Sequence, residues 1–199
     1  MTIAIVDYGA GNLASVKKAF DALGAAVMIT GDPEVASKAD KLVVPGVGHF
    51  AATVALDVSG LRDSIESGIA RGVPALGICL GMQWMFASST EALELCGLGI
   101  FAGECKRFPA EVKAPHVGWN QLAVVGESRL LRGIPDAAYV YFTHSYRAPV
   151  VLQTVATCEY GGSFSAVVEQ GNVFGVQFHP EKSGSVGRMM LENFCALPC

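Results

Sequence analysis

One cysteine of this chain stands in a setting that favours nucleophilic chemistry. Cys79 is the centre of the pattern Gly77-Ile78-Cys79-Leu80-Gly81, which follows an apolar run and precedes residues 82–87, a segment that favours helix. Glycines two positions to either side permit a tight strand-to-helix turn that exposes the sulfur, as in the serine-centred nucleophile elbow of hydrolases. The first free N–H groups of the helix would point at the sulfur and favour its thiolate. The pattern therefore predicts a cysteine nucleophile.

The other five cysteines lie in no comparable setting. They form no Cys-x-x-Cys pair, so the sequence indicates neither a zinc site nor a thioredoxin-like redox motif. Free cysteines are most often small apolar core residues. We assign this structural role to Cys96, Cys105, Cys158, Cys195 and Cys199. Neither a metal nor a cofactor is expected.

A thiol at neutral pH is only slightly ionised, so Cys79 needs a base beside it. His179 is the best placed histidine, because Glu181 follows two residues later in Phe178-His179-Pro180-Glu181. Residues two apart in extended backbone share a face, so the carboxylate could orient the imidazole as the third member of a triad does. An exposed His-x-Glu loop pair is the plain alternative. The pair becomes specific only together with Cys79.

Two glycines could complete the site at the same edge of a sheet. Pro45-Gly46-Val47-Gly48 follows an apolar strand, and its backbone N–H groups could approach a ligand closely and form an oxyanion hole with the Leu80 amide. An ordinary loop is the alternative. We interpret His49 as the first residue of a helix. His116 and His144 lack a matching carboxylate, so we interpret them as positioning or interface residues.

A rival pattern lies near the start of the chain. Gly9-Ala10-Gly11-Asn12-Leu13-Ala14 satisfies G-x-G-x-x-[G/A] between a strand and a helix, and Asp32 follows where a dinucleotide-binding acid belongs. Glycine pairs at such turns also arise from tight packing alone. Asp32 precedes Pro33 and could equally be a turn or helix-cap residue. From the residues alone, a dinucleotide-binding domain stays open.

Composition limits the classes of protein that fit. The 199 residues are 51% hydrophobic and 16% charged, which is typical of one compact globular domain. The net charge of −4 disfavours nucleic acid as a partner. The longest nearly apolar stretch, residues 73–87, is interrupted by proline and glycine and is too short to span a membrane. With no basic leader pattern at the start, we expect a cytoplasmic protein with reduced thiols.

The elements that must position these residues follow an α/β pattern. Strands are predicted at residues 3–6, 26–29, 41–44 and 73–76, and helices at residues 12–23 and 56–70. Such alternation implies a parallel sheet with helices on both faces. Residues 139–142, 154–157, 166–168 and 173–176 suggest antiparallel strands added to that sheet, and residues 187–196 a closing helix. We therefore predict a single domain over residues 1–199 with a mixed central sheet.

Together these motifs resemble the class I (triad) glutamine amidotransferases. The elbow around Cys79 and Gln177-Phe178-His179-Pro180-Glu181 carry the resemblance to that superfamily. Asp7-Tyr8-Gly9-Ala10-Gly11-Asn12-Leu13 and Pro115-His116-Val117-Gly118-Trp119-Asn120 narrow it to the glutaminase subunits of imidazole glycerol phosphate synthases. The likeness runs from Ile3 to Phe194. One departure is Ser88-Ser89-Thr90, where relatives often carry an acidic segment, and we expect it to affect only a peripheral loop.

The resemblance implies a role for each candidate residue. Cys79 would attack the side-chain amide of L-glutamine, with His179 as acid and base and Glu181 holding the imidazole. Leu80 and Gly48 would supply oxyanion N–H groups. Gln83, Ser145 and Tyr146 would bind the amino-acid end of glutamine, with Gly46 and Gly48 on the other side. We expect a peptide flip within residues 45–48 to complete the oxyanion hole, since glycine permits both orientations.

The resemblance also implies a partner. Ammonia would pass through a shielded path to a (β/α)8-barrel cyclase in a heterodimer, which would form imidazole glycerol phosphate and an aminoimidazole carboxamide ribotide for histidine biosynthesis. Trp119, Asn120 and Tyr139 are implied at the interface. The glycine pair near the start would belong to the glutaminase fold, with no dinucleotide. The glutaminase of pyridoxal phosphate synthase is a rival within the class, and a cysteine redox sensor is a rival outside it.

Overall fold

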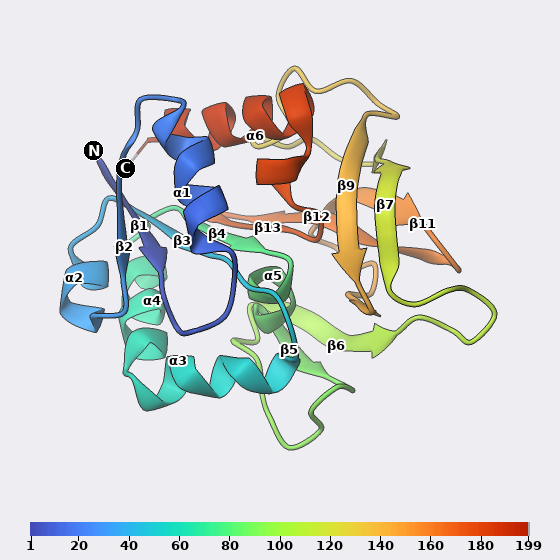
Figure 1. Cartoon of the computed structure of the whole chain (residues 1–199), viewed down its shortest axis with the longest axis horizontal. Helices are drawn as coiled ribbons and strands as arrows, with labels where there is room; N and C mark the ends of the chain where they lie inside the picture. Colours follow the sequence, from blue (N-terminus) through green and yellow to red (C-terminus); the bar gives the residue numbers. More distant parts are fainter. Residues whose placement is uncertain (199) are drawn as a thin grey trace.

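A computed structural model describes residues 1–198 and centres on one mixed sheet (Figure 1). Its eight strands run in the order β2-β1-β3-β4-β13-β12-β11-β8. From β2 to β13 neighbouring strands are parallel, and β12, β11 and β8 continue the sheet antiparallel. The strands are β1 (Thr2–Val6), β2 (Ala26–Thr30), β3 (Lys41–Val44), β4 (Ala75–Ile78), β8 (Ala123–Val124), β11 (Thr154–Glu159), β12 (Ser163–Gln170) and β13 (Val173–Val176).

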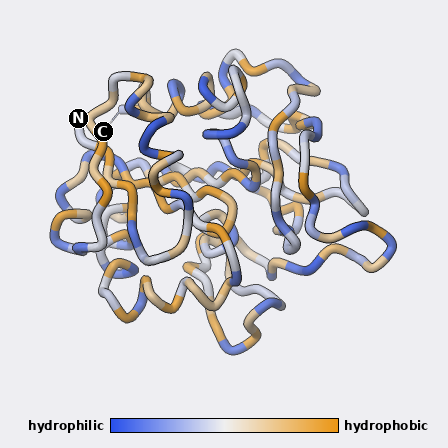
Figure 2. The backbone as a smooth tube through the Cα atoms, in the orientation of Figure 1, coloured by the Kyte–Doolittle hydropathy of each residue, from blue (hydrophilic) through white to orange (hydrophobic). Residues whose placement is uncertain are grey.

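Helices cover both faces of this sheet. Alternation along β1 sends Ile3 and Ile5 into the apolar cluster under α1 (Leu13–Asp21) and α6 (Gly184–Ala196). Ala4 and Val6 point into a second cluster under α2 (Pro33–Ser37), α3 (Val54–Val58) and α4 (Leu61–Ala70). The central strands are correspondingly apolar along much of their length (Figure 2). No helix within residues 1–198 combines the length and apolar character needed to cross a bilayer.

Two small sheets flank the central one. β5 (Phe86–Ser89), β6 (Phe101–Arg107) and β10 (Tyr146–Arg147) form a three-stranded sheet. β7 (His116–Gln121) and β9 (Tyr139–His144) form an antiparallel ribbon to one side of the molecule (Figure 1). Short elements complete the chain: α5 (Leu80–Trp84) and the 3-10 helices η1 (Phe50–Thr53) and η2 (Pro180–Lys182).

The predicted α/β class, with a mixed sheet and helices on both faces, is confirmed. The first three strands lie where the sequence predicts them within one residue, and β4 begins and ends two residues later than expected. Asn12 caps α1, its side chain accepting a hydrogen bond from the Ser15 backbone N–H. The closing helix begins at Gly184, three residues earlier than predicted.

Two of the predicted helices need correction. The helix predicted at residues 56–70 is two helices, α3 and α4, because Gly60 adopts a left-handed φ of 78° between them. The helix predicted after Cys79 ends at Trp84, and Phe86–Ser89 is strand β5. Pairing with β6 outweighs the helical preference of this segment, since Phe86 is fully buried against that sheet.

The second half is also arranged differently from the prediction. Residues 139–142 lie in β9, which pairs with β7 and does not join the central sheet. β13 is antiparallel to β12, as expected, but it is also the parallel neighbour of β4. Strands β5, β6, β7, β8 and β10 were not predicted at all. Their pairing is non-local, and short runs of this kind carry no periodic signal that sets them apart from loops.

Candidate active site

Cys79 occupies a strained turn directly after β4. Its φ of 53° lies in the left-handed region, which L-residues other than glycine seldom adopt. Both flanking glycines are required: a Cβ at Gly77 would lie 2.8 Å from the backbone of Gly81, and a Cβ at Gly81 would overlap the Val44 carbonyl oxygen. The turn is held by hydrogen bonds from Cys79 N to Val176 O (2.8 Å) and from Gln83 N to Cys79 O (3.0 Å). The geometry is that of a nucleophile elbow.

His179 and Glu181 lie at the same edge of the sheet. They follow β13, the parallel neighbour of β4, so both strands end side by side at their carboxyl ends. His179 Nδ1 lies 2.9 Å from Glu181 Oε1, and both side chains are almost fully buried. Pro180 opens η2, and Ser183 Oγ donates to the His179 carbonyl oxygen at 2.6 Å. The structure therefore brings the three predicted triad residues together.

The electrostatics of His179 reflect both neighbours. Burial by itself lowers the pKa of His179, but the Cys79 sulfur and the Glu181 carboxylate outweigh it and raise the pKa to about 10. Nε2 of His179 has no hydrogen-bond partner among residues 1–198. The neighbouring sulfur and carboxylate therefore favour the imidazolium form of His179.

The glycine loop lies against the elbow in a closed arrangement. The Leu80 backbone N–H, the expected oxyanion donor, donates to the Gly46 carbonyl oxygen at 3.3 Å. A Cβ at Gly46 would overlap the Tyr8 hydroxyl oxygen and lie 2.9 Å from Leu80 Cβ, so only glycine fits there. The Tyr8 hydroxyl is buried without a partner among the described residues, and burial raises its pKa. Gly48, with φ of 106°, faces the cavity described next.

A cavity of about 250 Å³ opens onto Cys79. Predicted site residues from three segments face it, whereas Gly46, His179 and Glu181 do not line it. Gln83 Nε2 donates to Tyr146 O at 2.8 Å and to Gln177 Oε1 at 3.0 Å, which leaves Gln83 Oε1 without a donor among the described residues. The lining residues are Gly48, Cys79, Leu80, Gln83, Glu91, Pro115, Thr143, His144, Ser145 and Tyr146.

Sequence reasoning missed two residues here. Glu91 lines the cavity, and its Oε2 accepts a hydrogen bond from Phe50 N at 2.7 Å. The prediction that Ser88-Ser89-Thr90 is a peripheral loop is therefore wrong: Ser89 is fully buried in β5, and its hydroxyl accepts a hydrogen bond from Glu91 N. Gln177 Nε2 lies 3.6 Å from Cys79 Sγ. Only the pairing of β4 with β13 reveals that contact.

The other histidines lie outside the triad: His49 begins a helix, as predicted, and His116 and His144 are buried rather than at a surface. His49 caps η1, its Nδ1 accepting from Ala51 N at 3.1 Å. His116 Nδ1 lies 3.2 Å from His144 Nε2, and both rings are buried among aromatic residues. Burial lowers the pKa of His116 to about 4 and that of His144 to about 3. Both imidazoles are neutral at pH 7.

The rival dinucleotide pattern is engaged in packing. A Cβ at Gly11 would lie 3.5 Å from the Gly46 Cα, so this turn packs against the glycine loop of the site. Asp32 caps α2, with its Oδ1 accepting from Glu34 N at 2.8 Å. The helix-cap interpretation of Asp32 is the one that the structure supports.

The remaining cysteines lie away from this site. Cys105 and Cys158 are buried in the core, as predicted, and burial raises the pKa of Cys158 to about 12. Cys195 is partly buried, whereas Cys96 is exposed and so departs from the prediction. Cys199 lies outside the described residues. Within residues 1–198 no group of three His, Cys, Asp or Glu side chains is arranged to hold a metal.

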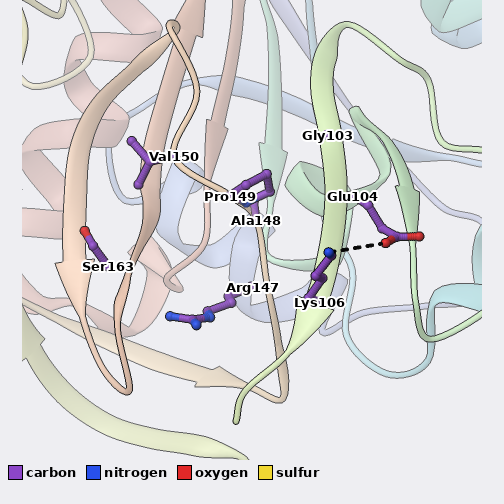
Figure 3. A pocket seen from close by; sticks show the side chains of 8 residues that line it. All are labelled: Gly103, Glu104, Lys106, Arg147, Ala148, Pro149, Val150 and Ser163. Carbon is purple, nitrogen blue, oxygen red and sulfur yellow. Dashed lines mark ion pairs between the residues drawn. The ribbon is translucent and has the colours of Figure 1, made fainter.

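A second cavity, of about 500 Å³, lies between β6 and residues 147–150 (Figure 3). Lys106 lies 3.9 Å from Glu104 at its rim, and Arg147 contributes a further cation. Its lining holds no cysteine or histidine.

Comparison with known proteins identifies similar sequences over nearly the whole chain. The family model "Glutamine amidotransferase class-I" matches residues 4–197. Two curated relatives are both named "Imidazole glycerol phosphate synthase subunit HisH". The relative from Moorella thermoacetica is 48% identical, and the match covers 96% of this chain and 93% of the relative's length. The one from Pyrococcus furiosus is 46% identical and covers 96% of this chain and 97% of its own.

Solved structures share the fold at low sequence identity. One titled "Crystal structure of glutamine amidotransferase" has a TM-score of 0.76 at 20% identity and covers 98% of this chain and 99% of its own. A second, titled "Structure of PurLQS from Thermotoga maritima", has a TM-score of 0.76 at 18% identity, and the match covers 98% of this chain and 97% of that chain. At this identity the likeness concerns the fold alone.

Proposed function

The chain belongs to the class-I glutamine amidotransferase family, within the HisH subunits of imidazole glycerol phosphate synthases, and we propose that Cys79, His179 and Glu181 are its catalytic residues. It hydrolyses glutamine and serves histidine biosynthesis. The observation that carries the residue assignment is the strained Cys79 turn beside a buried His179–Glu181 pair. The rival glutaminase of pyridoxal phosphate synthase is disfavoured, because the curated relatives described above are HisH subunits.

Hydrolysis then proceeds by nucleophilic attack of sulfur. The thiol proton passes to His179, and Cys79 Sγ adds to the side-chain amide carbon of glutamine to form a tetrahedral intermediate. His179 returns the proton to the departing ammonia, while Glu181 holds the imidazole through Nδ1. Water attacks the resulting thioester and releases glutamate. The raised pKa of His179 supports this assignment, because it favours the imidazolium that the leaving group needs.

The cavity beside Cys79 has the groups that glutamine requires. Gln83 Oε1 is an acceptor with no protein donor among the described residues, and Glu91 adds a carboxylate, so both suit the α-ammonium group of an amino acid. Ser145 and Tyr146 line the same cavity and suit the α-carboxylate end, and Gly48 lines it as well. Gly46 contributes indirectly, through its contact with Leu80.

The oxyanion hole is closed in this structure, since Gly46 O accepts the Leu80 N–H bond. Rotation of the Gly46–Val47 peptide would release this donor for the oxyanion, and glycines at positions 46 and 48 make the rotation accessible. Losing one oxyanion donor typically costs about 10²–10³ in rate. The closed arrangement therefore supports a glutaminase that idles until its partner is loaded.

We place the partner on the β7–β9 ribbon. Trp119, Val117 and Tyr139 are each more than half exposed there, and Trp119 lies beside Tyr141 with ring centroids 6.1 Å apart. Lys182, next to Glu181 in sequence, lies over the Tyr141 ring. An exposed aromatic surface beside the triad suits a protein interface. A (β/α)8-barrel cyclase docked there would receive ammonia before water protonates it. A cytoplasmic location suits this thiol chemistry.

The replacement Cys79→Ala tests the nucleophile. In the complex with the cyclase it should abolish glutamine-dependent synthesis and leave ammonia-dependent synthesis intact, since only glutamine hydrolysis needs the sulfur. Both rates are measured by formation of imidazole glycerol phosphate, with Cys96→Ala, at an exposed position, as the matched control. Full glutaminase activity in Cys79→Ala would contradict the assignment.

The replacement His179→Asn tests the base. It should slow glutamine turnover severely, and a near-normal kcat would remove His179 from the role of base.

A further inference from the structure

Gln177 is fully buried at the end of β13, and its side chain contacts the nucleophile. β4 and β13 are parallel, with Ile78 opposite Val176, so the next position in register places Gln177 beside Cys79. Gln177 Nε2 donates to Cys79 Sγ across 3.6 Å. The hydrolytic steps described above do not use this contact.

The orientation of the Gln177 side-chain amide follows from the Tyr146 carbonyl oxygen, which can only accept hydrogen bonds. The Tyr146 carbonyl oxygen accepts from Gln83 Nε2 at 2.8 Å, so the nitrogen end of Gln83 faces inward. The same Nε2 donates its second hydrogen to Gln177 Oε1 at 3.0 Å. Oε1 of Gln177 therefore faces Gln83, and its Nε2 must face the sulfur. A backbone carbonyl thus settles an assignment that is ambiguous for an isolated amide.

The same carbonyl is held from its other side by the buried histidine pair. His144 Nδ1 lies 2.8 Å from Tyr146 O and must donate to it, so His144 Nε2 accepts from His116 Nδ1. His116 Nε2 then accepts from Asn120 Nδ2 at 3.3 Å. With both imidazoles neutral, each of these atoms has one role. The Tyr146 carbonyl is anchored from two directions, and Gln83 with it.

We propose that Gln177 is a positioning residue for the glutaminase reaction: its amide N–H holds Sγ and favours the thiolate, and Gln83 and the Tyr146 carbonyl hold Gln177. A sulfur anion accepts a hydrogen bond more strongly than a neutral thiol does, so the contact favours the reactive form. The alternative contact, in which the Cys79 thiol donates to the Thr143 carbonyl oxygen, is longer at 3.9 Å. Gln177 neither gains nor loses a proton, and His179 remains the base. This inference rests on the proposed function, which makes Cys79 the nucleophile.

Alkylation of Cys79 in the full chain tests the contact independently of turnover. Iodoacetamide reacts with the thiolate, and peptide mass spectrometry gives the rate at Cys79 separately from the other cysteines. In Gln177→Met, which has similar size and no donor, the half-maximal rate should move to higher pH by about one to two units. In Gln177→Glu the acceptor for Gln83 remains but a negative charge faces the sulfur, so the shift should be larger. Unchanged profiles, or a smaller shift in Gln177→Glu, would overturn the proposal.

Turnover in the complex with the cyclase separates positioning from substrate binding. Gln177→Met should lower kcat for glutamine hydrolysis by about tenfold or more, with KM for glutamine within about twofold of native. Gln83→Met should change both constants, because Gln83 also faces the cavity. Gln170→Met, at an exposed position of β12, is the matched control and should match the native complex. A raised KM with native kcat in Gln177→Met would contradict the proposal.

Folding and the proposed function are controlled separately. Ammonia-dependent synthesis by each complex checks that the variant chain is folded and docked. If neither variant folds, the side-chain amide resonances of Gln177 in the ¹⁵N-labelled native chain decide: they should shift as Cys79 ionises, and resonances that ignore that ionisation would overturn the inference. A native complex that hydrolyses no glutamine would overturn the proposed function. An active native complex whose two Gln177 variants behave as native would overturn this inference alone.

Discussion

Cys79, the proposed nucleophile, occupies a backbone conformation that is unfavourable for an L-residue. A left-handed φ costs an L-residue about 1–2 kcal/mol, and at Cys79 the surrounding hydrogen bonds to Val176 O and from Gln83 N hold it in place. The conformation directs the sulfur toward the cavity and the neighbouring imidazole. Strain at this one residue is thus consistent with its proposed role as the nucleophile.

The packing at Gly46 provides a test at the same scale. Gly46→Ala should destabilise the chain by about 1–3 kcal/mol and impair glutaminase turnover, because the added Cβ overlaps the Tyr8 hydroxyl and crowds Leu80. Adding Tyr8→Phe should recover part of the loss, since it removes the overlapping oxygen. Urea unfolding and turnover of the single and double variants measure this.

The control for that experiment is Tyr8→Phe alone. The hydroxyl is buried without a partner within the described residues, so its removal should leave the free energy of unfolding unchanged or higher. If the double variant is no more stable than Gly46→Ala, the overlap with the hydroxyl is not what excludes a side chain at position 46.

The histidine pair predicts how stability depends on pH. In the unfolded chain His116 and His144 bind protons below about pH 6.5, but in the folded chain their pKa values are lowered to about 4 and about 3. The unfolded state therefore binds more protons as the pH falls below 6.5, and the chain loses stability down to about pH 4. Each histidine contributes at most about 1.4 kcal/mol per pH unit.

His179 has the opposite sign and a different window. Its pKa is raised to about 10, so its contribution to stability is complete below about pH 6.5 and is lost as the pH rises toward 10.

The pH dependence between 5 and 6.5 therefore tests the histidine pair. Over this range the free energy of unfolding, measured in urea, should change less steeply with pH in His116→Gln than in the native chain. His49→Gln, which removes an exposed histidine, is the control. Equal slopes in His116→Gln and the native chain would contradict the lowered pKa.

At the scale of elements, the site depends on which strands are neighbours. β4 delivers Cys79 and β13 delivers Gln177, His179 and Glu181, and their parallel pairing brings the four side chains to one edge. β13 also ends the parallel part of the sheet, because β12 pairs with it antiparallel. The active site thus lies where parallel and antiparallel pairing meet.

Helix α6 is tied to the sheet by a buried lysine. Lys41 is fully buried at the start of β3, and its Nζ donates to the Phe194 carbonyl oxygen at 3.1 Å and to that of Leu197. Lys41→Met should lower the free energy of unfolding by about 2 kcal/mol, because carbonyl groups at the end of α6 lose a charged donor. Urea unfolding measures the change.

Lys17→Met is the matched control for this replacement. Lys17 lies on α1 in an exposed pair with Asp21, and such pairs contribute only about 0.3–0.5 kcal/mol. A Lys41→Met chain as stable as the control would show that burying this charge costs as much as its hydrogen bonds return.

At the scale of the whole molecule, the closed oxyanion hole predicts dependence on the partner. The isolated chain should hydrolyse glutamine slowly, because the Leu80 N–H is engaged with Gly46 O. The complex with the cyclase and its nucleotide substrate should be faster by about 10²-fold or more, since it regains one oxyanion donor. Ammonia release measures both rates, with Cys79→Ala as the blank. Equal rates in the two states would refute the gating.

Local rules determined much of this protein from its sequence alone. The glycines around Cys79 and the His179–Glu181 spacing act within a few positions, so the residues themselves disclose the elbow, the paired His and Glu, and the α/β alternation. The motifs by themselves also indicate the family.

Tertiary structure alone decided what lies beside what. The pairing of β4 with β13 placed Gln177 against the sulfur, the β5–β6 pairing ended a predicted helix at Trp84 and brought Glu91 to the cavity, and the closed Leu80–Gly46 hydrogen bond came from loop packing. The physical reason is the distance along the chain over which each feature is determined. Helix caps and tight turns are set by neighbouring residues, whereas strand order and buried hydrogen-bond networks are selected by packing between segments far apart in the chain.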